Sequence, residues 1–311
     1  MFSTLFEKEL KAILLSPKFV ATFGVCTILI LLSVFIGIKE YESSRAQYET
    51  AVQLTQQGML ESSNWWSVDN TVFREPDPMQ VFVSGVNNDI GRLSDVSTWN
   101  EIKLEQSSYS EDPLFALFRF IDFTFIVQVV LSLFAILFTY DAINGERESG
   151  TLKLALSNAV PRSQYVLAKF AGSWVGLVIP LMIPILIACL LVIVLGVPFE
   201  AVHWQKFGAL VGVSVLYFSF FIALGILVSA LTRHSNISFL TLLVLWVVVV
   251  LIVPRAATMV AGQINPVTSI AEIESQKDRY STDKWDEYRR LRSRMWEERS
   301  AATEGMTPDE R

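Results

Sequence analysis

The chain has 311 residues and a formal net charge of −6, and 52% of its residues are hydrophobic. Its mean hydropathy is +0.42, whereas soluble domains usually have a negative value and an apolar share of about 45–50%. This composition excludes an ordinary soluble globular domain, and the acidic balance does not favour a surface that binds nucleic acid.

The hydrophobic residues concentrate in five blocks without Asp, Glu, Lys or Arg, each at least 18 residues long. A helix rising about 1.5 Å per residue needs about 20 residues to cross about 30 Å of hydrocarbon, so each block can span a bilayer. Core helices of a large soluble protein would carry a polar stripe, which the run LLVLWVVVVLIV lacks. The blocks predict an all-α polytopic membrane bundle with spans at residues 18–38, 123–140, 170–198, 207–232 and 235–254.

Residues 1–17 show an amphipathic helical pattern, in which Glu7, Lys8 and Lys11 lie opposite the apolar face. The apolar positions are Phe2, Leu5, Phe6, Leu10, Ile13 and Leu14. This pattern predicts a cytoplasmic interfacial helix that lies on the inner leaflet. A cleaved signal peptide fits less well, because the following block is too long and no A-x-A site follows it.

The short loops predict the orientation, because Lys and Arg accumulate on the cytoplasmic side of membrane proteins. With the N-terminus inside, the cytoplasmic segments hold Lys8, Lys11, Lys18, Arg147, Lys153, Arg162, Lys169 and Arg233. The short outer loop at 200–206 holds one basic residue. We therefore expect a multi-pass protein of the cell inner (plasma) membrane with a cytoplasmic N-terminus.

Residues 39–122 form a predicted extracytoplasmic insert with fourteen acidic and six basic residues, a net charge of −8. The sequence EYESSRAQYETAVQL at its start is typical of a helix, and Pro76 and Pro78 interrupt the later part. We expect a mostly helical insert. Its negative charge suits solubility, and it also suits attraction of cations or basic partners.

Polar residues on the second span fall on nearly one stripe, at Thr124, Gln128, Ser132 and Thr139. They predict either a substrate pathway or hydrogen bonds that hold neighbouring helices together. On the third span, Pro180 and Pro184 stand one turn apart and predict a kink or a break. Small residues at four-residue spacing also predict close helix packing, at Gly172, Gly176, Pro180, Pro184 and Ala188 and at Gly208 and Gly212.

An odd number of spans leaves residues 255–311 as an extracytoplasmic helical segment. Its charged helix carries one apolar stripe, at Trp285, Tyr288, Leu291 and Met295, which needs a partner surface. The final residues Thr307, Pro308, Asp309 and Glu310 have the pattern of a helix start with a capping box. They predict that the chain is cut short before a further helix and a sixth span, the alternative being a frayed natural C-terminus.

The charged segment 141–169 between the second and third spans lacks the residues needed for catalysis. Its glycines at Gly145 and Gly150 have the Walker A spacing, but Thr151-Leu152 stands where Lys-Ser/Thr is required to hold phosphate. His203 and His234 lie in separate loops and do not make a metal site. The sequence therefore predicts no enzyme, no bound cofactor and no metal.

The same segment predicts a compact element at the membrane surface. Gly145 and Gly150 allow tight turns, residues 151–157 form a short helix, and Pro161 ends it. Such a helix, held by two spans, can dock in a groove of a partner through apolar anchors and flanking charges. An ordinary solvated loop is the alternative.

The stretch YDAINGERESGTLKLALSNAVPRSQYVLAKF resembles the signature of ABC-2 type permeases, which follows their second span. It departs from the usual form at Ala155, where Leu is common, and at Ala159, where Pro is common. The stretches REPDPMQVFVSG and DPLFALFRFIDFTFIVQVVLSLFAILF resemble a subgroup with a large insert between the first two spans. Permease components of multi-copper enzyme maturation systems belong to that subgroup, and the similarity extends to about residue 266.

The resemblance implies a permease that exports an unknown substrate together with a cytosolic ABC ATP-binding subunit, which binds the ATP. Two copies of each subunit are implied, so a second permease copy or paralogue is a further partner besides the lipid bilayer. Carried over by position, the coupling helix that contacts the ATPase is Gly145, Glu146, Arg147, Glu148, Ser149, Gly150, Thr151, Leu152 and Lys153. Six spans are usual in this family. The alternative function is a non-transporting scaffold or sensor whose extracytoplasmic insert binds a ligand.

Overall fold

The computed structural model describes residues 2–61, 70–87, 90–96, 104–105, 122–157, 161–266 and 268–303. The chain divides into two compact units, Met1–Leu251 and Ile252–Arg311. Five helices among the described residues are long and apolar enough to cross a membrane, namely Pro17–Glu61, Phe123–Glu148, Arg162–Val194, Ala201–Leu231 and Ser235–Ile264. They confirm the predicted all-α polytopic bundle. Several of these helices extend beyond the apolar blocks of the sequence, so their charged ends lie outside the membrane-spanning segments.

The first unit begins with α1 (Phe2–Leu14) and α2 (Pro17–Glu61). The Ser16 hydroxyl accepts a hydrogen bond from the Phe19 N–H at 3.1 Å. Ser16 therefore caps α2, and Pro17 occupies its first position, where a missing N–H is harmless. α2 continues without interruption from the first span into the predicted insert.

The insert also contains two strands that are not among the predicted elements. β1 (Asn70–Phe73) pairs antiparallel with β2 (Leu93–Val96), with Phe73 opposite Leu93. A short 3₁₀ helix, η2 (Pro78–Val81), lies between them in the sequence. Helix therefore accounts for the insert as far as Glu61, and the described residues beyond it include this β-pair. Strands of four residues are too short for an alternating pattern to stand out in the sequence.

The second span consists of α5 (Phe123–Phe125), η3 (Ile126–Leu131, a π-helical stretch) and α6 (Ser132–Thr139). The short helices α7 (Asn144–Glu148) and α8 (Thr151–Ser157) follow it, and then α9 (Arg162–Val194) and α10 (Ala201–Leu231). α9 begins inside the predicted loop 141–169. It passes through the half-buried Pro180 and the buried Pro184 as one helix, so of the predicted kink or break, the break is wrong.

The last span of the first unit contains α11 (Ser235–Trp246) and most of the π-helical stretch η4 (Val247–Ile252). The second unit contains α12 (Val253–Ile264) and α13 (Ile270–Thr303). The predicted apolar stripe of α13 is exposed throughout, at Trp285, Tyr288, Leu291 and Met295. Residues 307–310, which predict a further helix, lie outside the described residues.

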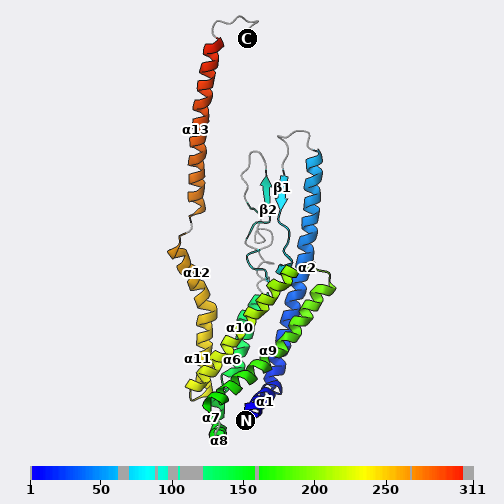
Figure 1. Cartoon of the computed structure of the whole chain (residues 1–311), viewed down its shortest axis with the longest axis vertical. Coiled ribbons are helices and arrows are strands. Elements are labelled where there is room, and N and C mark those ends of the chain that lie inside the picture. The colour runs from blue at the N-terminus through cyan, green and yellow to red at the C-terminus, as the bar shows by residue number, and fades with distance from the viewer. Residues whose placement is uncertain are drawn as a thin grey trace. The chain divides into compact units, whose positions relative to one another are not determined.

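In the first unit, α1, α7 and α8 lie at one end and the β-pair lies at the other, as Figure 1 shows. The insert is anchored to the bundle by η2, because Val81 and Phe82 are buried and Gly37 of α2 lies directly against the backbone of Val81. The Phe82 ring packs at a tilt of 37° against that of Phe207 in α10, with the ring centres 4.2 Å apart.

Small residues create two close helix contacts. A Cβ atom on Gly172 would lie 2.7 Å from Glu9 Cβ, so the predicted small-residue face of α9 accommodates α1. On α10, in contrast, Gly212 has open space around it, and the close contact is at Gly225, where a Cβ atom would overlap the Thr139 side chain of α6. Helices α6 and α10 can therefore approach closely only while residue 225 has no side chain.

We expect the Gly225→Ala substitution to destabilise the protein by about 1–3 kcal/mol, because the added methyl group forces α6 away from α10. The matched Gly212→Ala substitution on the same helix should not lower stability, because its methyl group meets open space and alanine favours the helix more than glycine does. Thermal unfolding of the purified protein in detergent measures both. Equal midpoints for the two variants would contradict the close contact at Gly225.

Candidate functional site

The charged motif of the sequence forms two short helices, α7 and α8, joined at Gly150. Gly150 has a φ of 77°, a left-handed conformation that suits glycine, and it lies in the turn between the two helices, as predicted. The predicted helix at residues 151–157 is confirmed. Gly145 lies within α7 and not in a turn, so the prediction of a turn at this residue is wrong.

Glu146 of α7 is bound by three side chains from two other helices. Its carboxylate accepts hydrogen bonds from Lys8 Nζ and Lys169 Nζ, each at 3.0 Å, and from the Tyr165 hydroxyl at 2.6 Å. Lys169 Nζ also donates to Glu9 Oε2 at 2.6 Å. This cluster, which we call the Glu146 network, joins α7 to α1 and α9.

The Glu146 network is largely buried. The exposed fractions of the side chains are 16% for Glu146, 9% for Lys169 and 11% for Glu9. Burial acts to raise the pKa of Glu146, but the hydrogen bond from Tyr165 and the positive charge of Lys169 outweigh it and lower that pKa to about 2. Glu146 therefore stays ionised, and its charge is compensated inside the protein.

Arg147 binds the C-terminal end of α10. Its guanidinium donates to the carbonyl oxygen of Thr232 at 3.0 Å and to that of Ala230 at 3.5 Å. A cation is favourable at this end of a helix, where carbonyl groups lack partners. Asn144 adds a hydrogen bond to Thr232 Oγ1 at 3.0 Å, and its backbone N–H donates to Ser229 Oγ at 3.2 Å.

Glu148 binds the N-terminal end of α11. Its carboxylate accepts hydrogen bonds from the Ser235 backbone N–H at 2.9 Å and from Ser235 Oγ at 3.0 Å. These hydrogen bonds lower the pKa of Glu148. A negative charge is favourable at a helix N-terminus, where N–H groups lack partners. Three consecutive charged residues of α7 thus connect it to α1, α9, α10 and α11.

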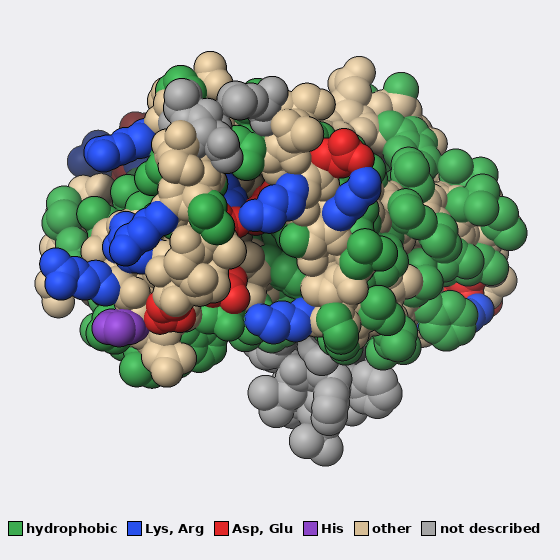
Figure 2. Space-filling model, turned by 90° about the horizontal axis from the view of Figure 1, so that it is seen from below, with side chains coloured by type: hydrophobic (Ala, Val, Ile, Leu, Met, Phe, Trp, Pro, Cys, Tyr) green, Lys and Arg blue, Asp and Glu red, His purple; other side chains and the backbone are tan. Residues whose placement is uncertain are grey.

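The residues that follow Glu148 form the outer surface of the bundle at the end where α7 and α8 lie. Ser149, Gly150, Thr151 and Lys153 are exposed, and Leu152 is half-buried against the core. Leu154, which is absent from the predicted contact segment, is 68% exposed. Figure 2 shows this end of the protein, where acidic and basic side chains lie among hydrophobic ones. In a helix of seven residues, the sequence pattern does not distinguish the exposed Leu154 from the packed Leu152.

The polar stripe of the second span divides between buried and exposed positions. Ser132 is fully buried and its hydroxyl accepts a hydrogen bond from Trp246 Nε1 of α11 at 2.8 Å. Thr139 is also fully buried, whereas Gln128 is half-buried and Thr124 is exposed. The contacts of Ser132 and Thr139 favour helix packing over a substrate pathway for these two residues. Among the described residues, no group of three or more His, Cys, Asp or Glu could hold a metal ion.

The arrangement is that of a membrane protein with a charged element at one end, connected to several spans. The family model described as ABC-2 family transporter protein matches residues 3–290. The chain therefore belongs to the ABC-2 transporter family, and it is a multi-pass permease subunit of an ABC transporter. Permeases of this family generally work with a cytosolic ATP-binding subunit. No curated protein matches the chain.

We expect the Lys169→Met substitution to destabilise the protein by about 3 kcal/mol, because it leaves the Glu9 and Glu146 carboxylates buried together without their shared cation. The midpoint of thermal unfolding in detergent measures the change. The matched Lys11→Met substitution removes an exposed partner of Glu7 and should leave the midpoint unchanged.

Adding Glu9→Gln to Lys169→Met should restore part of the lost stability, because one of the two carboxylates no longer carries a charge. A Lys169→Met protein as stable as the wild type would show that the Glu146 network does not hold α1 on α9.

Proposed function

We propose that the chain is the membrane subunit of an export-type ABC transporter, and that α7 and α8 form the coupling element contacted by a separate cytosolic ATPase. The observation that carries this proposal is that one short segment contains both residues that bind the bundle and residues that face outward. Glu146, Arg147 and Glu148 bind four helices of the bundle, while the adjacent residues from Ser149 to Leu154, apart from Leu152, present an outward surface. A solvated loop would not need such attachments.

The hydrogen bonds that attach α7 to the bundle suit the transfer of movement from the ATPase to the spans. When ATP draws two ATPase subunits together, a force applied to α8 reaches α7 through the short connection at Ser149 and Gly150 and through the hydrogen bond from Thr151 Oγ1 to the Glu146 carbonyl oxygen. From α7 it reaches the bundle through charge-assisted hydrogen bonds, which are stronger and more directional than neutral ones. The spans can then tilt as rigid bodies and change the side from which a substrate has access.

The assembly we propose contains two permease chains, identical or paralogous, and two ATPase subunits in the cell inner (plasma) membrane. The N-terminus and the α7–α8 end face the cytoplasm, and the insert faces outward. The placement of the β-pair and of α7–α8 at opposite ends of the first unit supports their lying on opposite sides of the membrane. The Lys and Arg residues of the short loops support the cytoplasmic position of the α7–α8 end. The motif and the long insert also support a place in the subgroup that resembles permease components of multi-copper enzyme maturation systems.

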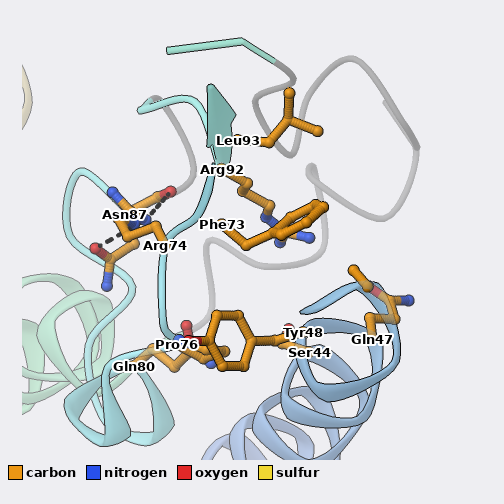
Figure 3. Close-up of a pocket in the computed structure, with 11 residues that line it drawn as sticks. Ser44, Gln47, Tyr48, Phe73, Arg74, Pro76, Gln80, Asn87, Arg92 and Leu93 are labelled. Carbon is orange, nitrogen blue, oxygen red and sulfur yellow. Dashed lines mark hydrogen bonds between the residues drawn. The ribbon is translucent and has the colours of Figure 1, made fainter. Parts of the chain in front are cut away.

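A second candidate function is a non-transporting scaffold or sensor whose insert binds a ligand. A pocket in the insert, lined by Ser44 and Tyr48 of α2 and by Phe73 of the β-pair among other residues, favours this alternative (Figure 3). The two functions differ in one respect, because only the transporter requires that α8 stimulate ATP hydrolysis by its partner.

We expect Leu154→Asp to weaken binding of the cognate ATPase subunit at least tenfold, because a charge then replaces the exposed apolar anchor of α8. Stimulation of ATP hydrolysis in reconstituted vesicles should fall in parallel, while thermal stability is unchanged. Leu60→Asp is the matched control, because Leu60 is 87% exposed and lies at the far end of α2. Undiminished coupling in the Leu154 variant would exclude α8 as the docking element.

We expect a cysteine at position 153 (Lys153→Cys) to react with a membrane-impermeant maleimide in inverted vesicles and not in intact cells. Thr50→Cys, on the exposed part of α2 beyond the first span, should show the opposite pattern. The native Cys26 and Cys189 are replaced by alanine beforehand, so that they do not contribute to labelling. Labelling of position 153 from outside the cell would overturn both the orientation and the proposed coupling to a cytosolic ATPase.

A further inference from the structure

Helix α13 carries an exposed apolar face along most of its length. Most of its large apolar residues are separated by three or four residues or by multiples of this spacing, which places them on one side of the helix. They are between 46% and 77% exposed, namely Ile270, Ile273, Tyr280, Trp285, Tyr288, Leu291, Met295 and Trp296. A continuous apolar surface of this kind marks a site of interaction. The proposed coupling of α7 and α8 to an ATPase does not involve it.

Two aromatic side chains form the middle of this apolar face. The rings of Trp285 and Tyr288 lie edge to face, with their centres 5.8 Å apart. Together with Tyr280, Ser281 and Lys284 they line a shallow hollow on the surface of α13. Tyr and Trp are enriched in protein interfaces, where they bury a large area at a small cost in side-chain entropy. The middle of α13 therefore suits contact with another helix.

The charges of α13 divide into an acidic half and a basic half. Residues 270–287 contain six acidic and three basic residues, and residues 288–303 contain five basic and two acidic residues. The two halves thus have net charges of −3 and +3, and the boundary between them lies next to the middle of the helix. Two antiparallel α13 helices that overlap along their full length therefore place opposite charges together. In a parallel pair, like charges would meet.

We propose that α13 pairs with α13 of a second copy of this chain, in an antiparallel arrangement with the two apolar faces together. The charge pattern favours a second copy, because the helix is complementary to itself. The same surface is used on both copies, so the contact closes as a two-fold symmetric pair. Lys277 and Lys284 lie on the same face at seven-residue spacing from Ile270, and polar residues within such a seam fix the register of the pair.

This pairing goes beyond the proposed function, which includes two permease chains but does not say how they meet. It requires two identical chains, which is one of the two assemblies proposed above. Its failure would leave the coupling role of α8 unaffected, because that role is tested by ATPase stimulation with the Leu154 variant.

Cysteine cross-linking of the full chain in membranes tests the pairing and its direction. One tagged form carries Ile273→Cys and a second, differently tagged form carries Met295→Cys, and both have Cys26 and Cys189 replaced by alanine. In an antiparallel pair these two positions lie close together, whereas cysteines at the same position lie about 33 Å apart, because a helix rises about 1.5 Å per residue. A short bismaleimide should therefore cross-link the two forms when they are expressed together, and neither form with itself.

Two other results would overturn the proposal. A cross-link of either form with itself would show that the helices run parallel. No cross-link in the mixture would show that α13 is covered by something else, such as a lipid surface or another part of its own chain.

Two substitutions locate the contact on the helix. Leu291→Asp should abolish the cross-link in the mixture, because it places a charge on the apolar face. Ser293→Asp is the matched control, since it adds the same charge about 200° further round the helix, on the side away from this face. It should leave the cross-linked fraction unchanged.

Thermal unfolding in detergent shows whether each variant is folded, and Tyr288→Asp decides the matter if Leu291→Asp does not fold. An undiminished cross-link in the Leu291 variant, or an equal loss in the Ser293 control, would overturn the assignment of the contact to the apolar face.

Discussion

The attachment of Glu146 to α1 and α9 is the interaction on which the α7–α8 end of the bundle depends. A carboxylate in this half-enclosed position is tolerated because Lys8, Lys169 and Tyr165 surround it, and because Lys169 is shared with Glu9. Removing Lys169 leaves the Glu9 and Glu146 carboxylates largely buried without their shared cation, so these three residues behave as a unit. The Glu146 network therefore fixes the position of α7 relative to α9, the helix of the third span.

The other two charged residues of α7 also attach it to the bundle, by binding the ends of helices. Arg147 meets the carbonyl end of α10, and Glu148 meets the amide end of α11. Each therefore binds the partial charge of opposite sign that a helix presents there. The single turn of α7 thus contacts the start or the end of several spans. This arrangement suits the proposed role of α7, which is to move these spans together.

The sequence predicts the spans well, because a continuous apolar block about 20 residues long has few other structural solutions. It also predicts the turn at Gly150 and the helix that follows. It does not predict that Glu146 turns inward, because its partner Lys8 belongs to the N-terminal helix. Its other partners, Tyr165 and Lys169, lie inside the predicted loop 141–169, where the sequence does not indicate that α9 has already begun. The β-pair is missed for a similar reason, since its strands of four residues are stabilised by pairing between segments about twenty residues apart.

The uninterrupted course of α2 has a consequence for the insert. Ser44 and Tyr48 belong to the same rigid helix as the first span, while Phe73 and Arg92 belong to the β-pair. If the first span inclines relative to the β-pair, the two walls of the pocket separate or converge. Any molecule held between those walls then favours one inclination of the span over another, and by thermodynamic reciprocity the inclination sets how tightly that molecule is held.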